Sequence, residues 1–475
     1  MRATRRFRTP IAIVVAALAL FGLTGAPSAR AAAPPNVVVI MTDDQWFDSM
    51  AYMPKTNALL VSQGVTFSNY HVSNPLCCPS RSTFLTGQYS HNTGVESNSA
   101  PNGGFAKFND TSTLATWLHD AGYHTTLIGK YLNGYGSGTS ATYIPPGWDN
   151  WRAATQGTQL LYDYTINENG TPVTYGSEPT DFKTDVFARM AVENINARAS
   201  LGPFFMDVAV TAPHNEFNGD TQSVRAAPRH EGLFANEPFP LKESFNEANV
   251  TDKPLWVRNL PLLTATQQAS IAQSWRDKLE GLQSVDDLVE SVVNALSAQG
   301  VLDNTIIVFT SDNGFFFGEH RIPGGKNRVY EEATRVPLVI KGGIFKGAKI
   351  RKQVVANIDL APTIASVTGI TPGLTPDGIS LVPYATSGTY RNTRAVLLEN
   401  SPDNPNTFNA VRTSKWVYSA LGSGEEELYN IRRDPLQLKS KHAAATLAAT
   451  KAALAVTLDT LDDCAGSVCD VNFVG

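Results

Sequence analysis

Short apolar segments alternate with amphipathic segments along most of the chain, and this alternation limits what it can fold into. Five apolar runs have the length and composition of strands: residues 37–41, 125–128, 204–211, 305–310 and 338–340. Apolar residues recur at helical spacing in residues 114–121, 184–197 and 279–297. Strands that alternate with helices are typical of an α/β fold, in which helices cover both faces of a large, mostly parallel sheet.

The chain has 475 residues, enough for one large domain and a smaller one. A cluster of Gly, Ser and Thr at residues 386–389 predicts a boundary, so we expect a catalytic domain at 36–385 and a subdomain at 390–475. Within the subdomain, three short runs predict antiparallel strands: residues 395–398, 409–412 and 415–420. The Ala-rich stretch 443–461 predicts a terminal helix. The polar, loop-like stretch from about 215 to 261 is typical of segments that shape a cleft.

Residues 1–31 differ from the rest of the chain. Four arginines precede an apolar run at 11–23, and small residues follow it. This pattern predicts a signal peptide that is cleaved near Ala29-Arg30-Ala31. The apolar run is too short for a comfortable membrane span, and twin-arginine and general secretory export both stay open. We therefore expect a secreted or periplasmic protein without a stable membrane anchor.

The charge of the chain argues against some partners. The formal net charge is −5, and 42% of the residues are hydrophobic, which is ordinary for a globular protein. Cleavage after residue 31 removes five arginines and no acidic residue, so 38 basic and 43 acidic residues become 33 and 43, a net charge of −10. A chain this acidic does not attract anionic polymers in general. We expect no nucleic-acid partner, and any recognition of an anion must be local.

The four cysteines form two unlike pairs. Cys464 and Cys469 lie close in sequence and fit a short-loop disulfide of an exported protein. Cys77 and Cys78 are adjacent, and a disulfide between neighbouring residues is strained. Neither pair has histidines or further cysteines at the spacing of a zinc site. The pair at 464 and 469 is therefore predicted to be structural, whereas the pair at 77 and 78 needs another explanation.

Acidic side chains follow two of the predicted strands. Asp43 and Asp44 come directly after residues 37–41, and Asp312-Asn313-Gly314 follows residues 305–310. Ligands of α/β sheets bind outside the carboxyl ends of the strands, and two adjacent ends would collect three carboxylates and one amide oxygen. This all-oxygen set suits Ca²⁺ or Mg²⁺ better than zinc. Turn chemistry is the alternative, since Asp and Asn-Gly often end strands.

The stretch Cys77-Cys78-Pro79-Ser80-Arg81, followed by Leu85-Thr86-Gly87, resembles the modification signature of the type I sulfatases. In that family a dedicated formylglycine-generating enzyme oxidises the first cysteine of the motif to Cα-formylglycine. The hydrated aldehyde carries two hydroxyls on one carbon, one to attack sulfur and one to expel sulfate. The resemblance implies that Cys77 is modified in this way. Pro79 and Gly87 suit the first position and the end of a helix.

The resemblance also implies roles for the acidic residues. Asp43, Asp44, Asp312 and Asn313 correspond to ligands of a single Ca²⁺ or Mg²⁺, and the modified Cys77 completes the shell. It further implies that the fold is alkaline-phosphatase-like, with a large, mostly parallel sheet and a small C-terminal antiparallel sheet.

Four more residues match active-site positions of the family: Arg81, Lys130 after Gly129, His214 after Ala212-Pro213, and Lys326 after Gly324-Gly325. For each residue taken singly there is an ordinary alternative: Arg81, Lys130 and Lys326 as solvated cations, and His214 as a structural histidine. With the resemblance, Arg81 is expected to hold the aldehyde hydrate. Lys326 and His214 are expected to help deliver a proton to the leaving alcohol.

The chain departs from the family pattern at Leu132. Many sulfatases have a histidine there, two residues after the motif lysine, as the base that releases sulfate. His91 and His320 are the other candidates for that base.

The stretch 129–135 resembles N-acetylglucosamine-6-sulfatases and related extracellular heparan 6-O-sulfatases. Four further stretches share this resemblance: residues 77–81, 146–148, 282–289 and 355–359.

The sequence therefore predicts an exported, formylglycine-dependent sulfatase that removes 6-O-sulfate from N-acetylglucosamine-type sugars. An aryl sulfatase or a sulfatase of another glycan is the nearest alternative. A phosphatase or phosphodiesterase of the same superfold is a further one, although such enzymes typically use Ser or Thr with two zinc ions. A glycan-binding protein without turnover is the alternative from another class, if Cys77 stays a thiol.

Overall fold

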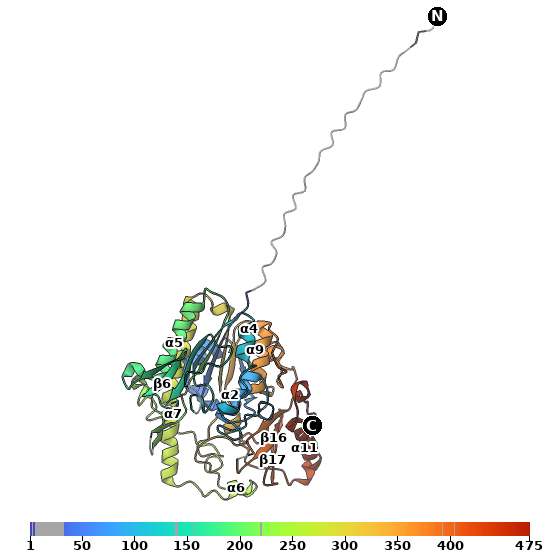
Figure 1. The fold of residues 1–475 in the computed structure, drawn as a ribbon. Helices are drawn as coiled ribbons and strands as arrows, with labels where there is room; N and C mark the ends of the chain where they lie inside the picture. The colour runs from blue at the N-terminus through green and yellow to red at the C-terminus, as the bar shows by residue number, and fades with distance from the viewer. Residues whose placement is uncertain are drawn as a thin grey trace. The chain divides into compact units, whose positions relative to one another are not determined.

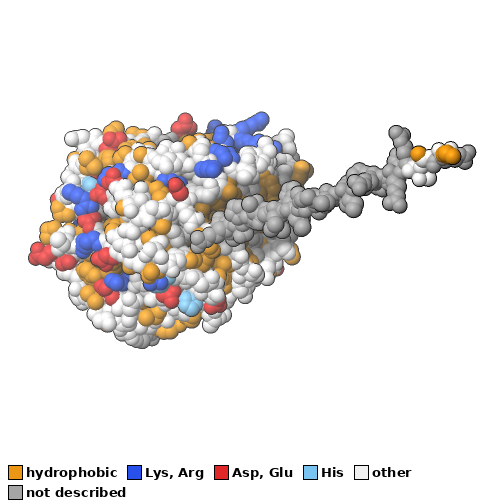
Figure 2. Space-filling model, turned by 90° about the horizontal axis from the view of Figure 1, so that it is seen from above, with side chains coloured by type: hydrophobic (Ala, Val, Ile, Leu, Met, Phe, Trp, Pro, Cys, Tyr) orange, Lys and Arg blue, Asp and Glu red, His pale blue; other side chains and the backbone are white. Residues whose placement is uncertain are grey.

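The computed structural model describes residues 33–137, 141–156, 158–218, 221–391, 393–402 and 404–475, together with residues 1, 3 and 4. Residues Pro34–Gly475 form one compact unit. The predicted signal peptide at residues 1–31 lies almost entirely outside the described residues, so it stays a prediction. On the face shown in Figure 2, both basic and acidic side chains occur among apolar ones.

A ten-stranded mixed sheet forms the centre of this unit (Figure 1). In spatial order its strands are β13 (Lys349–Arg351), β2 (Val65–Phe67), β12 (Leu338–Lys341), β11 (Thr305–Ser311), β1 (Asn36–Thr42), β8 (Phe204–Ala209), β4 (His124–Gly129), β5 (Asn150–Gln156), β6 (Tyr164–Glu168) and β7 (Thr171–Tyr175). The five strands from β11 to β5 run parallel. Strand β12 runs antiparallel to β11, β6 to β5, and β7 to β6.

Helices cover both faces of this sheet, as predicted (Figure 1). Three of them pack on one face: α2 (Cys77–Thr86), α4 (Leu114–Asp120) and α9 (Leu360–Thr368). Two longer ones pack on the other: α5 (Lys183–Arg198) and α7 (Ala265–Ala298). Val37 and Val39 of β1 join the first core, whereas Val38 and Ile40 join the second. Because successive strand residues point to opposite faces and both faces are buried, β1 is apolar throughout.

The C-terminal part contains the predicted small antiparallel sheet. Its strands in order are β15 (Val396–Glu399), β16 (Phe408–Arg412), β17 (Trp416–Leu421) and β18 (Glu426–Asn430). The terminal helix α11 (Ala448–Asp462) packs on one of its faces. Cys464 and Cys469 form the expected disulfide, with an S–S distance of 2.09 Å. The fold class is confirmed, and the division of the chain at 386–389 stays a prediction.

Shorter elements connect these layers. The two-stranded pairs are β9 (Glu216–Asn218) with β10 (Thr221–Ser223) and β3 (Tyr70–His71) with β14 (Val355–Ala356). The short helices are α1 (Pro54–Thr56), α3 (Ser90–Thr93), α6 (Leu255–Arg258), α8 (Glu331–Thr334) and α10 (Val382–Thr386). In the described part of 215–261, which omits residues 219 and 220, the elements are β9, β10, α6 and one 3₁₀ turn at Pro228–His230, in line with the predicted loop.

Helix α7 begins well before its predicted start at residue 279. Its first turn carries a capping box, in which the Thr264 side chain accepts from the Gln267 backbone and the Gln267 side chain accepts from the Thr264 N–H. Residues between Ala265 and the predicted start are mostly polar, and of their apolar side chains only Ile271 and Trp275 reach the core. Two core residues are too few to form the apolar repeat on which the prediction depended.

Candidate functional site

The ends of the parallel strands bring the predicted site residues together. β1 and β11 pair up to Thr42 and Ser311, so Asp43 and Asp312 leave adjacent strands at the same edge. Lys130 follows β4, and the loop after β8 carries His214. All of the predicted site residues form one group, the buried cluster: Asp43, Asp44, Cys77, Arg81, Lys130, His214, Asp312, Asn313 and Lys326. Their roles in a reaction stay predictions.

Asp43 and Asp44 both turn into the cluster although they are consecutive. In a strand, successive side chains point to opposite faces. Asp44 instead has a left-handed backbone with a φ of 67°, a conformation that is uncommon for residues other than glycine. This turn directly after β1 is what places two neighbouring carboxylates on one site, as strained residues at functional sites often do.

The helix α2 presents Cys77 to the cluster. It begins at Cys77, two residues earlier than predicted, so Pro79 lies inside the first turn. The missing N–H of Pro79 costs nothing there, because the first four N–H groups of a helix lack an intrahelical partner. Gly87 ends the helix with a φ of 72°, as predicted. The Cys77 Sγ lies 3.5 Å from Asp43 Oδ1, and Lys326 Nζ lies 2.8 Å from that sulfur.

Each buried carboxylate has a cationic partner. Lys130 Nζ pairs with Asp43, and Lys326 Nζ pairs with Asp44. The Arg81 Nε donates to Asp312 Oδ2 at 2.8 Å. These close pairs offset the cost of burying charge, which a lone carboxylate could not bear.

The cations set the titration of the acidic groups. Burial would raise the pKa of Asp43, but Lys130 and the neighbouring cations outweigh it and hold the pKa well below its usual value. Asp312 shows the opposite balance, because burial and repulsion by Asp43 raise its pKa to about 6 against the influence of Arg81. One carboxylate thus stays ionised while its neighbour is the readier to accept a proton.

The thiol and the imidazole are also shifted. Burial, followed by the charge of Asp43, raises the pKa of the Cys77 thiol to about 11. An unmodified Cys77 is therefore a protonated, weakly nucleophilic thiol at neutral pH. Burial lowers the pKa of His214 to about 4, although Asp44 and Asp43 act in the other direction. Its Nε2 lies 3.7 Å from Asp44 Oδ2, and its Nδ1 lies 2.7 Å from the Asn215 carbonyl.

Several residues of the cluster could hold a metal ion. One ligand atom from each of Asp43, Asp44, Cys77 and His214 lies within 4.8 Å of the others. Asn313 Oδ1 is buried and has no hydrogen-bond partner among the described residues, whereas its Nδ2 donates to Asp44 Oδ1 at 2.6 Å. An orphaned acceptor beside buried carboxylates is what a bound Ca²⁺ or Mg²⁺ would satisfy. The residues present therefore fit such an ion.

Two pockets reach the cluster. The larger, of about 520 Å³, is lined by Asp44, His214 and Lys326, with Phe315 and Phe317 on its walls. The other, of about 390 Å³, lies on the side of Lys130 and Leu132. Both volumes fall in the range of small-molecule sites. A substrate therefore has room beside the cluster.

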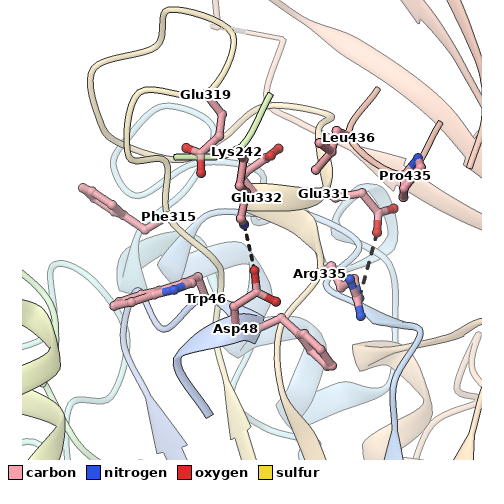
Figure 3. A pocket seen from close by; sticks show the side chains of 11 residues that line it. Trp46, Asp48, Lys242, Phe315, Glu319, Glu331, Glu332, Arg335, Pro435 and Leu436 are labelled. Atoms are coloured by element: carbon pink, nitrogen blue, oxygen red, sulfur yellow. Dashed lines mark hydrogen bonds and ion pairs between the residues drawn. The ribbon is translucent and has the colours of Figure 1, made fainter. Parts of the chain in front are cut away.

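A third pocket of about 230 Å³ is lined by no residue of the cluster (Figure 3). Trp46 and Phe315 lie on one side of it, and Leu436 lies on the other. Two ion pairs cross its lining. They are Lys242 with Asp48 at 2.7 Å and Arg335 with Glu331 at 4.0 Å. Phe315 also lines the 520 Å³ pocket, so it separates the two spaces.

The two candidate bases lie apart from the cluster. His91 Nδ1 is 2.9 Å from Glu399, and its Nε2 is 2.9 Å from the Cys464 carbonyl. His320 is fully buried against Glu247, at 2.7 Å. Among the contacts of the described residues, neither imidazole reaches the cluster. Neither placement supports the role of a base in this site.

One charged residue beside the cluster was not predicted. Lys278 of α7 is fully buried, and burial lowers its pKa to about 8, although the nearby carboxylate of Asp44 favours the charged form. It lies at helical spacing from the core residues Trp275 and Leu282. A lysine inside an apolar stripe is the signal that could have found it.

Comparisons with known proteins cover nearly the whole described unit. Residues 35–370 match the family model Sulfatase, and residues 318–463 match the model "N-sulphoglucosamine sulphohydrolase, C-terminal". The arylsulfatase of Volvox carteri is 33% identical, over 96% of this chain and 79% of its own length. The N-acetylglucosamine-6-sulfatase of Homo sapiens is 36% identical over 74% of this chain and 64% of its own length, slightly under two thirds. A protein solved in complex with its substrate D-glucosamine-2-N,6-O-disulfate is 25% identical, with a TM-score of 0.76 over 90% of this chain and 97% of that one.

Proposed function

The chain belongs to the sulfatase family and is a sulfuric ester hydrolase, and from this premise we propose that it hydrolyses the 6-O-sulfate of N-acetylglucosamine-type sugars. One observation carries the reaction: Cys77 lies between carboxylates and cations beside a pocket of about 520 Å³. The substrate rests on the likeness to a relative named N-acetylglucosamine-6-sulfatase. An aryl sulfate or another sulfated glycan is the second candidate, because a relative named arylsulfatase aligns with more of the chain.

We propose that Asp43, Asp44, Asp312, Asn313 and the formylglycine formed from Cys77 hold one Ca²⁺ or Mg²⁺. Maturation then requires a formylglycine-generating enzyme as a partner. When bound, the cation would draw charge from the sulfuryl oxygens, and the formylglycine would supply the geminal hydroxyls.

The chain's own cations bind and orient the ester. Arg81 is fixed by Asp312 and by the Lys130 carbonyl, at 2.8 and 3.0 Å, so its guanidinium is held rigidly beside residue 77. Two further positive charges lie near residue 77: Lys130 pairs with Asp43, and Lys326 contacts the Cys77 sulfur. Such preorganised charges stabilise a sulfuryl group most where negative charge develops.

Proton delivery to the leaving alcohol falls to Lys326 and His214, which line the 520 Å³ pocket. Burial would lower the pKa of Lys326, but the charge of Asp44 and its neighbours outweighs it and holds that pKa well above its usual value, so Lys326 is charged. His214 is neutral in the unliganded site because burial lowers its pKa to about 4. An anionic ester in the pocket favours the charged imidazole and raises that pKa. His214 can then share a proton with the leaving oxygen.

We propose further that residues 36–385 form the catalytic domain, that 390–475 form the small subdomain, and that the protein is exported. All residues of the buried cluster precede residue 385, which agrees with that division. No helix among the described residues is long and apolar enough to cross a membrane.

The test uses protein produced together with a formylglycine-generating enzyme. Mass spectrometry of the peptide that contains residue 77 should show the aldehyde. Sulfate release from N-acetylglucosamine-6-sulfate should exceed release from the 3-sulfate and from other sulfated sugars. Brisk turnover of another sulfated glycan, without turnover of the 6-sulfate, would overturn the substrate. If the protein keeps a thiol at residue 77 and binds glycans without releasing sulfate, the result favours a glycan-binding protein instead.

A further inference from the structure

Lys278 is a buried cation that the proposed reaction does not use. It lies on the core-facing side of α7 beside Leu279, and its side chain is fully buried. Burying an ammonium group carries a large free-energy cost unless nearby groups stabilise it. A lysine at this position therefore calls for a physical reason.

The contacts of Lys278 join two loops of the site. Its Nζ donates to the Pro213 carbonyl at 2.7 Å and lies 4.2 Å from the centre of the Phe315 ring. Pro213 directly precedes His214 in the loop after β8, and Phe315 belongs to the loop after β11. β8 and β11 flank β1, which carries the carboxylates. One ammonium group thus connects the loops on both sides of the cluster.

The position of His214 depends on the loop that Lys278 holds. The imidazole Nδ1 faces the Asn215 carbonyl of the same loop, so the ring orientation follows the backbone there. Lys278 does not line the 520 Å³ pocket, whose residues from α7 are Ser270, Ile271 and Ser274. It therefore acts on the site through the loop and not by touching a substrate.

We propose that Lys278 is a positioning residue that holds the Pro213 carbonyl and thereby aims the imidazole of His214 at the leaving-group oxygen. The proposal rests on the proposed role of His214 in the sulfatase reaction. A small displacement of a catalytic group lowers the rate steeply, by up to about 100-fold for 1 Å. Loss of the clamp should therefore affect the proton-dependent step most.

The leaving group provides the test. A sugar alkoxide needs protonation to leave, whereas the phenolate of an activated aryl sulfate needs little. Lys278→Met removes the ammonium group and keeps a long side chain. It should lower kcat/KM for N-acetylglucosamine-6-sulfate roughly 10-fold to 100-fold more than kcat/KM for the aryl sulfate. Lys278→Arg keeps the charge and the donor, and should recover most of that ratio.

Two further variants separate positioning from folding. Lys253, in the loop before α6, is also buried and donates to a backbone carbonyl, that of Gln437, at 2.8 Å. Lys253→Met should lower turnover of both substrates alike. In a His214→Ala background, Lys278→Met should not change the substrate ratio further. Equal losses on both substrates in Lys278→Met, or a further change of ratio in the double variant, overturn the proposal.

A spectroscopic measurement tests the contact without turnover. The imidazole NMR signal of His214, assigned by its loss in His214→Ala, should shift in Lys278→Met and stay in place in Lys253→Met. An unshifted signal overturns the proposal, and Lys278→Gln serves the same comparison if Lys278→Met does not fold. Failure of the wild type to release sulfate would count against the proposed function. If the wild type is active but neither the substrate ratio nor the His214 signal changes in Lys278→Met, only the proposal for Lys278 is contradicted.

Discussion

Two neighbouring thiols at the start of α2 have different surroundings. Cys77 Sγ faces Asp43 and Lys326, whereas the side chain of Cys78 packs in the apolar core. We therefore predict that Cys77→Ala abolishes sulfate release and that Cys78→Ala retains much of it, because a small core truncation costs about 1 kcal/mol of stability. Mass spectrometry shows whether residue 77 or residue 78 carries the aldehyde, and an assay of sulfate release measures the activity of both variants. An aldehyde at residue 78, or turnover by Cys77→Ala, would contradict the assignment.

Metal content tests the carboxylates individually. Purified wild type should contain about one Ca²⁺ or Mg²⁺ per chain. Asp312→Asn keeps the size of the side chain and removes a charged oxygen, so it should weaken metal affinity by roughly tenfold or more. Asp207→Asn is the matched control, since Asp207 is a buried carboxyl of β8 outside the cluster. Two zinc ions per chain in the wild type would instead support a phosphatase.

Most site residues could be predicted because each directly follows a strand or opens a helix and matches a short motif. Asp43 and Asp312 are examples, since strand pairing alone makes them neighbours. Lys278 could not be placed in this way, because its relation to His214 depends on how α7 packs against the loop after β8. The base that replaces the usual histidine at Leu132 has no local signal either.

Among the elements, continuous apolar runs gave reliable predictions. β1 extends one residue beyond its predicted range at each end, and β11 extends one residue at its C-terminal end only. Both strands are largely apolar because both faces of the sheet are buried. β7 was missed, since its residues are half-exposed to exposed and include Pro172. β12 was found as a strand, but its antiparallel direction follows from tertiary packing that periodicity does not encode.

At the scale of elements, one buried ion pair connects the small sheet to α9, the helix that packs on the large sheet. Arg394, just before β15, makes two hydrogen bonds to Asp359, which precedes α9, at 2.5 and 2.8 Å, and both side chains are fully buried. Arg394→Met leaves Asp359 buried without its cationic partner and should lower the free energy of unfolding by about 3–5 kcal/mol. Urea denaturation measures this loss.

The matched control is Arg391→Met. Arg391 pairs with Asp470, but both side chains keep more than a fifth of their surface exposed. Exposed pairs contribute only about 0–1 kcal/mol. Comparable losses in the two variants would show that the buried pair does not hold the small sheet in place.

At the scale of the whole molecule, His91 joins three distant parts of the chain. It lies on α3, bonds Glu399 of β15 and reaches the carbonyl of Cys464 next to the disulfide. The adjacent Asn92 donates to that same carbonyl and to Asp377, at 2.7 and 2.9 Å. The stability of the small sheet should therefore depend on the charge of His91.

Burial alone would lower the pKa of His91, but the hydrogen bond and charge of Glu399 outweigh it and raise the pKa to about 9. The unfolded value is about 6.5, so the folded state binds the proton more tightly. The stabilisation is fully present below pH about 6.5 and is lost as the pH rises through about 9. His91→Asn should thus lower the urea midpoint most in mildly acidic buffer and least above pH about 9. Glu399→Gln should remove the same pH dependence. The double variant should lose no more stability than either single variant. A stability difference that does not change with pH would contradict this role of the pair.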